Sequence, residues 1–135
     1  MRVGHRWPDL VLLLGDGNTT DPKVLIDNGT TDVAAIAMGI MHSCVVHRDG
    51  TVSCWGGNTD GQLGNGSVSA ANISRPAKVP GLTGVVAVSA GGSFSCALGS
   101  DTRVRCWGAN TVGQLGIGTT SAYSLSPVVV KSATP

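Results

Sequence analysis

The feature that most constrains this chain is an internal repeat with a period of 52 residues. Residues 33–66 align without gaps on residues 85–118, and 17 of these 34 positions are identical. A fixed period of about 20 to 50 residues is typical of proteins that stack one supersecondary unit on the next. The sequence therefore predicts two stacked copies of one small unit.

Weaker copies of the unit flank the two central ones. The run Leu14-Gly15-Asp16-Gly17 is similar to Leu63-Gly64-Asn65-Gly66, so the chain begins near the end of one unit. We expect four segments: an unmatched head (residues 1–13), a partial repeat (14–32), a first full unit (33–84), and a second unit with a terminal outer strand (85–135).

Composition excludes a helical bundle. All eight acidic residues are Asp and 20 residues are Gly, so strong helix formers are scarce. Each unit contains short apolar stretches separated by Gly, Asn and Asp, a pattern typical of strands and turns. The expected strands are 33–37, 43–47, 51–55 and 77–79 in the first unit, and 85–89, 95–98, 103–107 and 128–130 in the second.

Cysteine positions follow from the hairpin between the second and third strands. Arg48-Asp49-Gly50 suits a three-residue loop in which the glycine takes a positive φ. Cys44 then faces Cys54, and Cys96 faces Cys106, with Cβ atoms about 4.5 to 5.5 Å apart. We predict two hairpin disulfides. Zinc binding by the four cysteines and buried free thiols in a reducing cell remain as alternatives.

Two long motifs connect the chain to a known family. They are Gly39-Ile40-Met41-His42-Ser43 followed by Asp49-Gly50-Thr51-Val52, and the run from Trp55 to Gly66, each with a counterpart in the second copy. The chain resembles the regulator of chromosome condensation repeat, whose units form the four-stranded blades of a β-propeller. Two positions depart from the pattern, because Phe94 replaces the histidine of the first copy and Thr102 replaces its turn glycine.

The resemblance implies an all-β fold with about two to two and a half blades of four short antiparallel strands. One chain of this length does not close the ring. We expect the duplicated apolar and glycine positions to form the blade core, with each tryptophan wedged between blades. These positions are Trp55, Trp107, Leu63, Leu115, Gly39 and Gly91.

Residues for catalysis are scarce. His42 is interpreted as a hydrogen-bonded structural residue, since the same position in the second copy holds Phe94. The Asp residues mostly flank Gly, Asn or Thr, as turn-forming Asp does. We therefore expect no enzyme activity, no metal site and no cofactor.

Charge and hydropathy limit the partners. A net charge of +1 does not supply the positive field that nucleic acid binding needs. The longest aliphatic run, Leu10 to Leu14, is too short to span a membrane. Trp7, Pro8 and Asp9 interrupt the only candidate signal peptide. We expect neither a nucleic acid nor a membrane partner.

Four of the six asparagines begin an Asn-x-Ser/Thr acceptor for N-glycosylation: Asn18, Asn28, Asn65 and Asn72. The same composition is also typical of ordinary loops. Disulfides persist in oxidising compartments, so we expect a protein of the cell exterior or cell surface, with the periplasm as another option.

Incomplete closure leads to the functional prediction. Two stacked units expose an apolar flank at each end, residues 14–32 could complete a neighbour's blade, and residues 128–130 would end as an unpaired strand. We therefore predict a non-enzymatic extracellular scaffold that assembles with itself into a ring or filament. The alternative is a fragment of a larger closed propeller that binds protein partners, such as a small GTPase regulator or an enzyme inhibitor.

Overall fold

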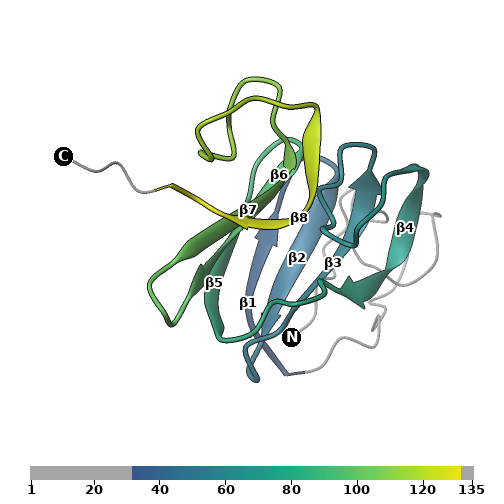
Figure 1. Cartoon of the computed structure of the whole chain (residues 1–135). Coiled ribbons are helices and arrows are strands. Elements are labelled where there is room, and N and C mark those ends of the chain that lie inside the picture. Colours follow the sequence, from purple (N-terminus) through teal and green to yellow (C-terminus); the bar gives the residue numbers. More distant parts are fainter. Residues whose placement is uncertain (1–31, 132–135) are drawn as a thin grey trace.

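The computed structural model describes residues 32–131 and consists of two four-stranded antiparallel sheets side by side (Figure 1). The first sheet has the order β1-β2-β3-β4 and the second β5-β6-β7-β8, so each strand pairs with its neighbours in sequence. We call the two sheets the first and second blade. Their strands are β1 (Val33–Met38), β2 (His42–His47), β3 (Val52–Asn58), β4 (Ser69–Lys78), β5 (Val85–Ala90), β6 (Phe94–Gly99), β7 (Val104–Ala109) and β8 (Tyr123–Val129).

These blades confirm the all-β prediction. The predicted partial repeat (14–32) and head (1–13) lie almost entirely outside the described residues. Within residues 32–131, no helix has the length and apolar character needed to cross a membrane.

The register of the central hairpin is the predicted one. Cys44 pairs with Cys54 and Ser43 with Trp55 in the first blade. Gly50 closes the loop with a φ of +86°, and Thr102 takes the same left-handed region at +69° in the second blade. Only glycine enters that region at no steric cost, so the second turn forms in spite of its threonine.

The outer strands are longer than predicted, and one differs in its pairing. β4 runs from Ser69 to Lys78, whereas we predicted only residues 77–79. The terminal segment was predicted to end unpaired, but β8 pairs with β7, with Val129 opposite Arg105 and Val128 opposite Cys106. The second blade is therefore a complete sheet that needs no strand from a neighbour.

The core lies between the two blades. One face of the first blade contributes Cys44, Val46, Val52 and Cys54, each at most 1% exposed. Trp107 and Ala97 cover this face from the second blade. The cluster is completed by Leu63 of the β3–β4 loop, by Val79 and Leu82 of the connection between the blades, and by Val85 of β5. This interface is the only place where described residues show how one blade packs on another.

Candidate functional site: the blade interface and the exposed flank

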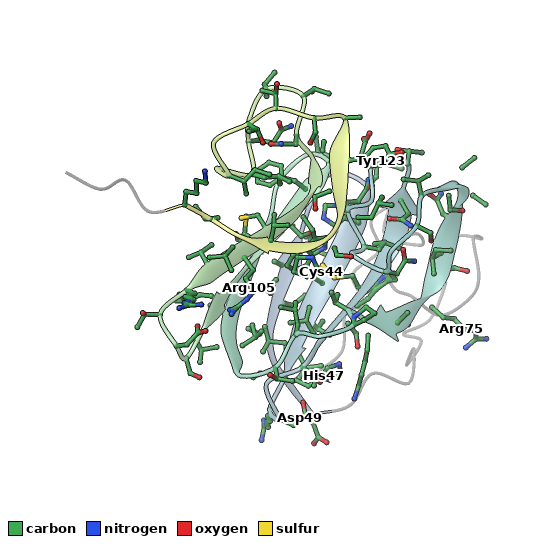
Figure 2. The ribbon with its side chains drawn as sticks, in the orientation of Figure 1. Cys44, His47, Asp49, Arg75, Arg105 and Tyr123 are labelled. Atoms are coloured by element: carbon green, nitrogen blue, oxygen red, sulfur yellow. A yellow bond between two sulfur atoms is a disulfide. The ribbon has the colours of Figure 1, made fainter. Side chains whose placement is uncertain are left out.

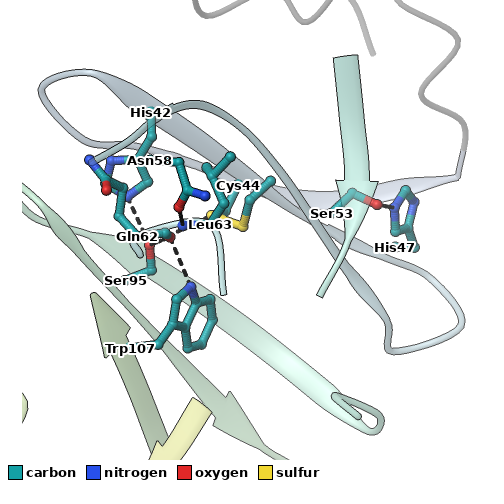
Figure 3. Close-up of a disulfide and its surroundings, with 10 residues drawn as sticks. His42, Cys44, His47, Ser53, Asn58, Gln62, Leu63, Ser95 and Trp107 are labelled. Carbon is teal, nitrogen blue, oxygen red and sulfur yellow. Dashed lines mark hydrogen bonds between the residues drawn. A yellow bond between two sulfur atoms is a disulfide. The ribbon is translucent and has the colours of Figure 1, made fainter. Parts of the chain in front are cut away.

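A backbone carbonyl joins the two blades. The carbonyl oxygen of Gln62, in the loop after β3, accepts a hydrogen bond from Trp107 Nε1 at 2.8 Å and another from Ser95 Oγ at 2.9 Å (Figure 3). Trp107 and Ser95 are both fully buried. Because buried polar groups are costly without partners, this pair of bonds fixes how the second blade sits on the first.

His42 extends the same network. Its Nε2 lies 2.8 Å from Ser95 Oγ (Figure 3). The serine hydroxyl has one hydrogen and donates it to Gln62, so Nε2 of the histidine must be the donor. The ring is then the neutral tautomer with its proton on Nε2, and its buried Nδ1 has no partner. This geometry agrees with the structural role expected for His42.

We expect acid to weaken the interface through His42. Burial lowers the pKa of His42 from 6.5 to about 4. The unfolded chain therefore binds a proton that the folded chain excludes, and stability that is complete above pH 6.5 is lost as pH falls toward 4. At about 1.4 kcal/mol per pKa unit the loss is roughly 3 kcal/mol. Urea unfolding at a series of pH values measures it.

His42→Phe is the matched variant, because Phe94 occupies the same position in the second blade. Its unfolding free energy should be nearly constant between pH 6.5 and 4.5. Asp49 and Asp101 have pKa values lowered mainly by side-chain hydrogen bonds from Thr51 and Arg105, so they titrate at still lower pH. An equal slope in wild type and variant would contradict this assignment.

Paired glycines allow the close approach of the blades. A Cβ on Gly39 would lie 2.4 Å from the carbonyl oxygen of Gly91 and 2.4 Å from Cε1 of His42. Gly91 in turn leaves room for the ring of Phe94. Both glycines are therefore needed where β1 and β5 turn into the next strand, which gives a physical reason for their duplication.

Asparagines organise the long loop of each blade. Asn58 and Asn110 are fully buried. Asn58 Oδ1 accepts from the backbone N–H of Leu63, and Asn110 Oδ1 accepts from that of Leu115. Sequence reasoning did not assign a role to these asparagines, to Ser95 or to Gln62. Each of these residue types occurs at the equivalent position of both copies, and this repetition could have identified them.

The four cysteines form two disulfides, Cys44–Cys54 and Cys96–Cys106, with Cα atoms 4.1 Å apart in each. No cysteine is free. All four sulfurs are used by this pairing, so the zinc alternative loses its ligands in this structure. The remaining predicted core positions, Trp55, Leu63 and Leu115, are at most 3% exposed.

The acceptor asparagines are only partly described. Asn65 and Asn72 are exposed, as glycosylation requires. Asn65 already accepts hydrogen bonds at Oδ1 from the N–H and hydroxyl of Ser67. Asn18 and Asn28 lie outside the described residues, and the use of all four sites stays a prediction.

The far flank of the second blade repeats the buried face of the first blade. Register places Leu98 and Val104 where the first blade has Val46 and Val52. Leu98 is 39% exposed and Val104 37%, whereas Val46 and Val52 are 1% and 0% exposed. The same apolar positions are thus covered in one blade and open in the other. We call this surface, with Phe94, the exposed flank.

Two sheets of this topology, stacked face to face with a tryptophan between them, define part of a β-propeller. Family comparison agrees: one model of the regulator of chromosome condensation (RCC1) repeat matches residues 49–98, and a second matches residues 33–62 and 85–114. The chain belongs to the RCC1 repeat family.

Among its relatives, human HERC6, a probable E3 ubiquitin-protein ligase, is 36% identical over 105 residues, which cover 76% of this chain and 10% of HERC6. Human regulator of chromosome condensation is 31% identical over 151 aligned residues, covering all of this chain and 36% of that protein. The chain thus spans about a tenth of the first relative and about a third of the second.

Solved structures show the same fold. Prp20p from Saccharomyces cerevisiae matches with a TM-score of 0.76 at 20% identity, over 96% of this chain and 34% of that chain. Human WBSCR16 matches with a TM-score of 0.71 at 25% identity, over 84% and 29%. Both matches cover only about a third of the solved chain, which agrees with two blades of a larger ring.

Proposed function

We propose that this chain is a non-enzymatic pair of blades from a larger RCC1-type propeller, and that the complete propeller binds protein partners through the exposed loops at its rims. The observation that supports this most directly is the exposed flank. Leu98 and Val104 carry apolar side chains that the fold buries at the equivalent positions of the first blade. Burial of such side chains is worth about 1.5 to 3 kcal/mol each, so a further blade would be favoured there.

Hydrogen-bonding groups on the flank support the same proposal. In the first blade the Gln62 carbonyl accepts from Trp107, and the Gly66 N–H donates to the Leu125 carbonyl at 3.0 Å. The equivalent groups of the second blade are the carbonyl of Gln114 and the N–H of Gly118, and they have no partner within residues 32–131. A third blade with its own tryptophan and outer strand would satisfy both groups.

Relatives favour this function over an independent scaffold. Similar proteins include the human regulator of chromosome condensation, HERC ubiquitin-protein ligases, and yeast Prp20p, which has binding properties to Gsp1p and histones. We infer binding of proteins as the shared class of activity, and the choice of partner for this chain remains part of the proposal.

Self-assembly into a ring or filament is less well supported. Head-to-tail contact needs two open flanks, but Ser43, Val45 and Trp55 on the opposite face of the first blade are 0%, 2% and 0% exposed within the single chain. We therefore expect the isolated chain to stay monomeric at micromolar concentration in light scattering. Growth into long polymers would favour the scaffold function instead.

Catalysis is not part of the proposal. Residues 32–131 contain the His42–Ser95 contact described above, in which Ser95 is fully buried, and a second one between His47 Nε2 and Ser53 Oγ at 2.8 Å (Figure 3). Ser53 is only 5% exposed, so a substrate would not reach its hydroxyl as a nucleophile requires. Two disulfides also favour an oxidising compartment, and on that ground we propose an extracellular or cell-surface location.

Extension of the chain by one blade tests the proposed function. A copy of residues 81–131 appended after Lys131, which keeps the connection between blades, should cover Leu98 and Val104 and raise the thermal midpoint. Protection of the Gly118 amide from hydrogen exchange should also rise. The control is the same extension with Trp107→Ala in the appended copy, which removes the interblade hydrogen bond. If the extended chain and its control match the original, the flank is not a blade-binding surface.

A further inference from the structure

A hollow of about 460 Å³ lies at the hairpin end of the first blade. Figure 2 shows His47 and Asp49 at this end, where β2 passes into β3. Among residues 32–131, every residue that lines the hollow is ionisable, in a chain where Asp, Lys and Arg together make up only 13% of residues. We call it the ionic hollow, and its residues are Asp32, His47, Arg48, Asp49 and Lys78.

The repeat itself shows that the fold does not require these side chains. Register gives each of the five positions an equivalent in the second blade, and four of the equivalents have no ionisable side chain. The equivalents, in the same order, are Gly84, Gly99, Ser100, Asp101 and Val129. The second blade forms the same four strands with these residues, so the strands do not depend on the ionic set.

Asp49 is the exception and has a structural role. Its Oδ1 accepts hydrogen bonds from the N–H and hydroxyl of Thr51 at 3.0 and 2.7 Å. Asp101 accepts from the N–H of Arg103 at 3.0 Å in the same turn of the second blade. The Asp49 carboxylate is therefore committed to its own loop.

Asp32 is held in a conformation that favours glycine. Its φ is +54°, and Gly84 takes +64° at the equivalent position. Non-glycine residues are uncommon in this region. Asp enters this region more readily than most non-glycine residues, and here it places a carboxylate at the edge of the hollow.

The hollow holds two cations, Arg48 and Lys78, beside the carboxylates of Asp32 and Asp49. The single ion pair among residues 32–131 joins Arg105 to Asp101, so Arg48 and Lys78 form none there. Both are exposed, whereas His47 is half-buried and its Nε2 lies 2.8 Å from Ser53 Oγ of β3. The adjoining hairpin end of the second blade adds a further exposed cation, Arg103, which lies outside the ion pair, so this surface can take an added anionic group. Arginine suits a carboxylate because its planar guanidinium donates two parallel hydrogen bonds.

The surface continues onto the second blade. Val85 N–H donates to the Gly50 carbonyl at 2.9 Å, and Ser100 N–H donates to the Gly84 carbonyl at 2.8 Å. These bonds join the two hairpin ends into one rim, on which Arg103 is also exposed and outside the ion pair. A ligand longer than one residue could therefore contact both blades.

We propose that the ionic hollow binds an acidic peptide segment of a protein partner, with a carboxylate held between Arg48 and Lys78. The proposal rests on the function proposed above, because it assigns a partner chemistry to one rim of the propeller. Attraction between exposed charges falls with ionic strength, so binding should weaken as salt rises.

Fluorescence anisotropy with labelled hexaglutamate tests the proposal on the full chain, with hexalysine and a neutral Gly-Ser hexapeptide as comparison probes. The test variant is Arg48→Ser with Lys78→Val, the residues that the second blade has at these positions. It should fold as the wild type does and bind hexaglutamate at least about tenfold more weakly, at about 20 mM salt.

A charge-matched control is Arg75→Ser with Lys131→Ser, which removes two exposed cations that do not line the hollow. Its affinity for hexaglutamate should stay within about twofold of wild type. Equal loss in both variants, preference for hexalysine, or no binding of hexaglutamate would overturn the proposal. The appended-blade experiment leaves Arg48 and Lys78 unchanged, so failure of one proposal is distinguishable from failure of the other.

Discussion

Replacing Trp107 with alanine should lower the free energy of unfolding by about 3 to 5 kcal/mol, the usual cost of removing a fully buried aromatic side chain. Trp107 is 0% exposed and lies in the core between the blades. The change also removes one of the two donors to the Gln62 carbonyl. Because domains of this size have only about 5 to 15 kcal/mol of stability, the blade pair would be close to unfolding at 37 °C.

Trp107→Phe separates the two contributions. The phenylalanine keeps most of the apolar volume and removes only the Nε1 donor. Its loss of unfolding free energy should therefore be smaller than that of the alanine variant, by at least about 1 to 2 kcal/mol. Ser95 would still donate to the Gln62 carbonyl. Urea unfolding followed by circular dichroism measures both variants. If the unfolding free energy of the alanine variant lies within about 1 kcal/mol of the wild-type value, Trp107 does not hold the blades together.

Sequence reasoning could place the tryptophan but not its partner. Duplication at a spacing of 52 residues singled out Trp55 and Trp107, and the family resemblance put them between blades. The acceptor is a backbone carbonyl that lies 45 residues earlier in the chain. A carbonyl has no residue-specific signal, so only the packed structure reveals which one the indole contacts.

Hairpin register was predictable for a local reason. A three-residue loop determines every cross-strand pair, and Cys44 opposite Cys54 followed from counting back from the turn. The outer strand offered no such signal. Half of residues 69–78 are polar, and the segment includes Pro76, which strands accept mainly at a sheet edge, so the composition resembled a loop.

Burial of the flanks could not be predicted either. Repetition implied two equivalent open faces, but Trp55 and its neighbours are buried in the single chain, while Leu98 and Val104 are exposed. Val46 and Val52, the positions of the first blade equivalent to Leu98 and Val104, are also buried, because the second blade covers them. This asymmetry favours a piece of a larger ring over a symmetric assembling unit.

Loss of either disulfide should destabilise the chain, and the two losses should differ. Both bridges join cysteines 10 residues apart. The chain-entropy contribution is then the same for each, about 2.7 kcal/mol at 25 °C. Any difference between Cys44→Ala with Cys54→Ala and Cys96→Ala with Cys106→Ala comes from packing in the folded state.

Packing predicts that the first bridge matters more. Cys44 and Cys54 are 0% and 1% exposed and lie against the second blade, whereas Cys96 lies half-buried on the exposed flank. The Cys44/Cys54 variant loses interblade contacts in addition to the cross-link, so its total cost should approach about 5 kcal/mol, near the upper end for native disulfides. The other variant should lose about 2 to 3 kcal/mol.

Reduction of the folded chain tests the same difference through the order in which the two disulfides open. Thiol–disulfide exchange needs access of the attacking thiolate to a sulfur, so Cys96–Cys106 should open first under mild reductant. Alkylation followed by mass spectrometry of the peptides reports which pair is labelled at each time. Earlier labelling of Cys44 and Cys54, or equal unfolding free energies for the two double variants, would mean that the interface between the blades opens more readily than the exposed flank reacts.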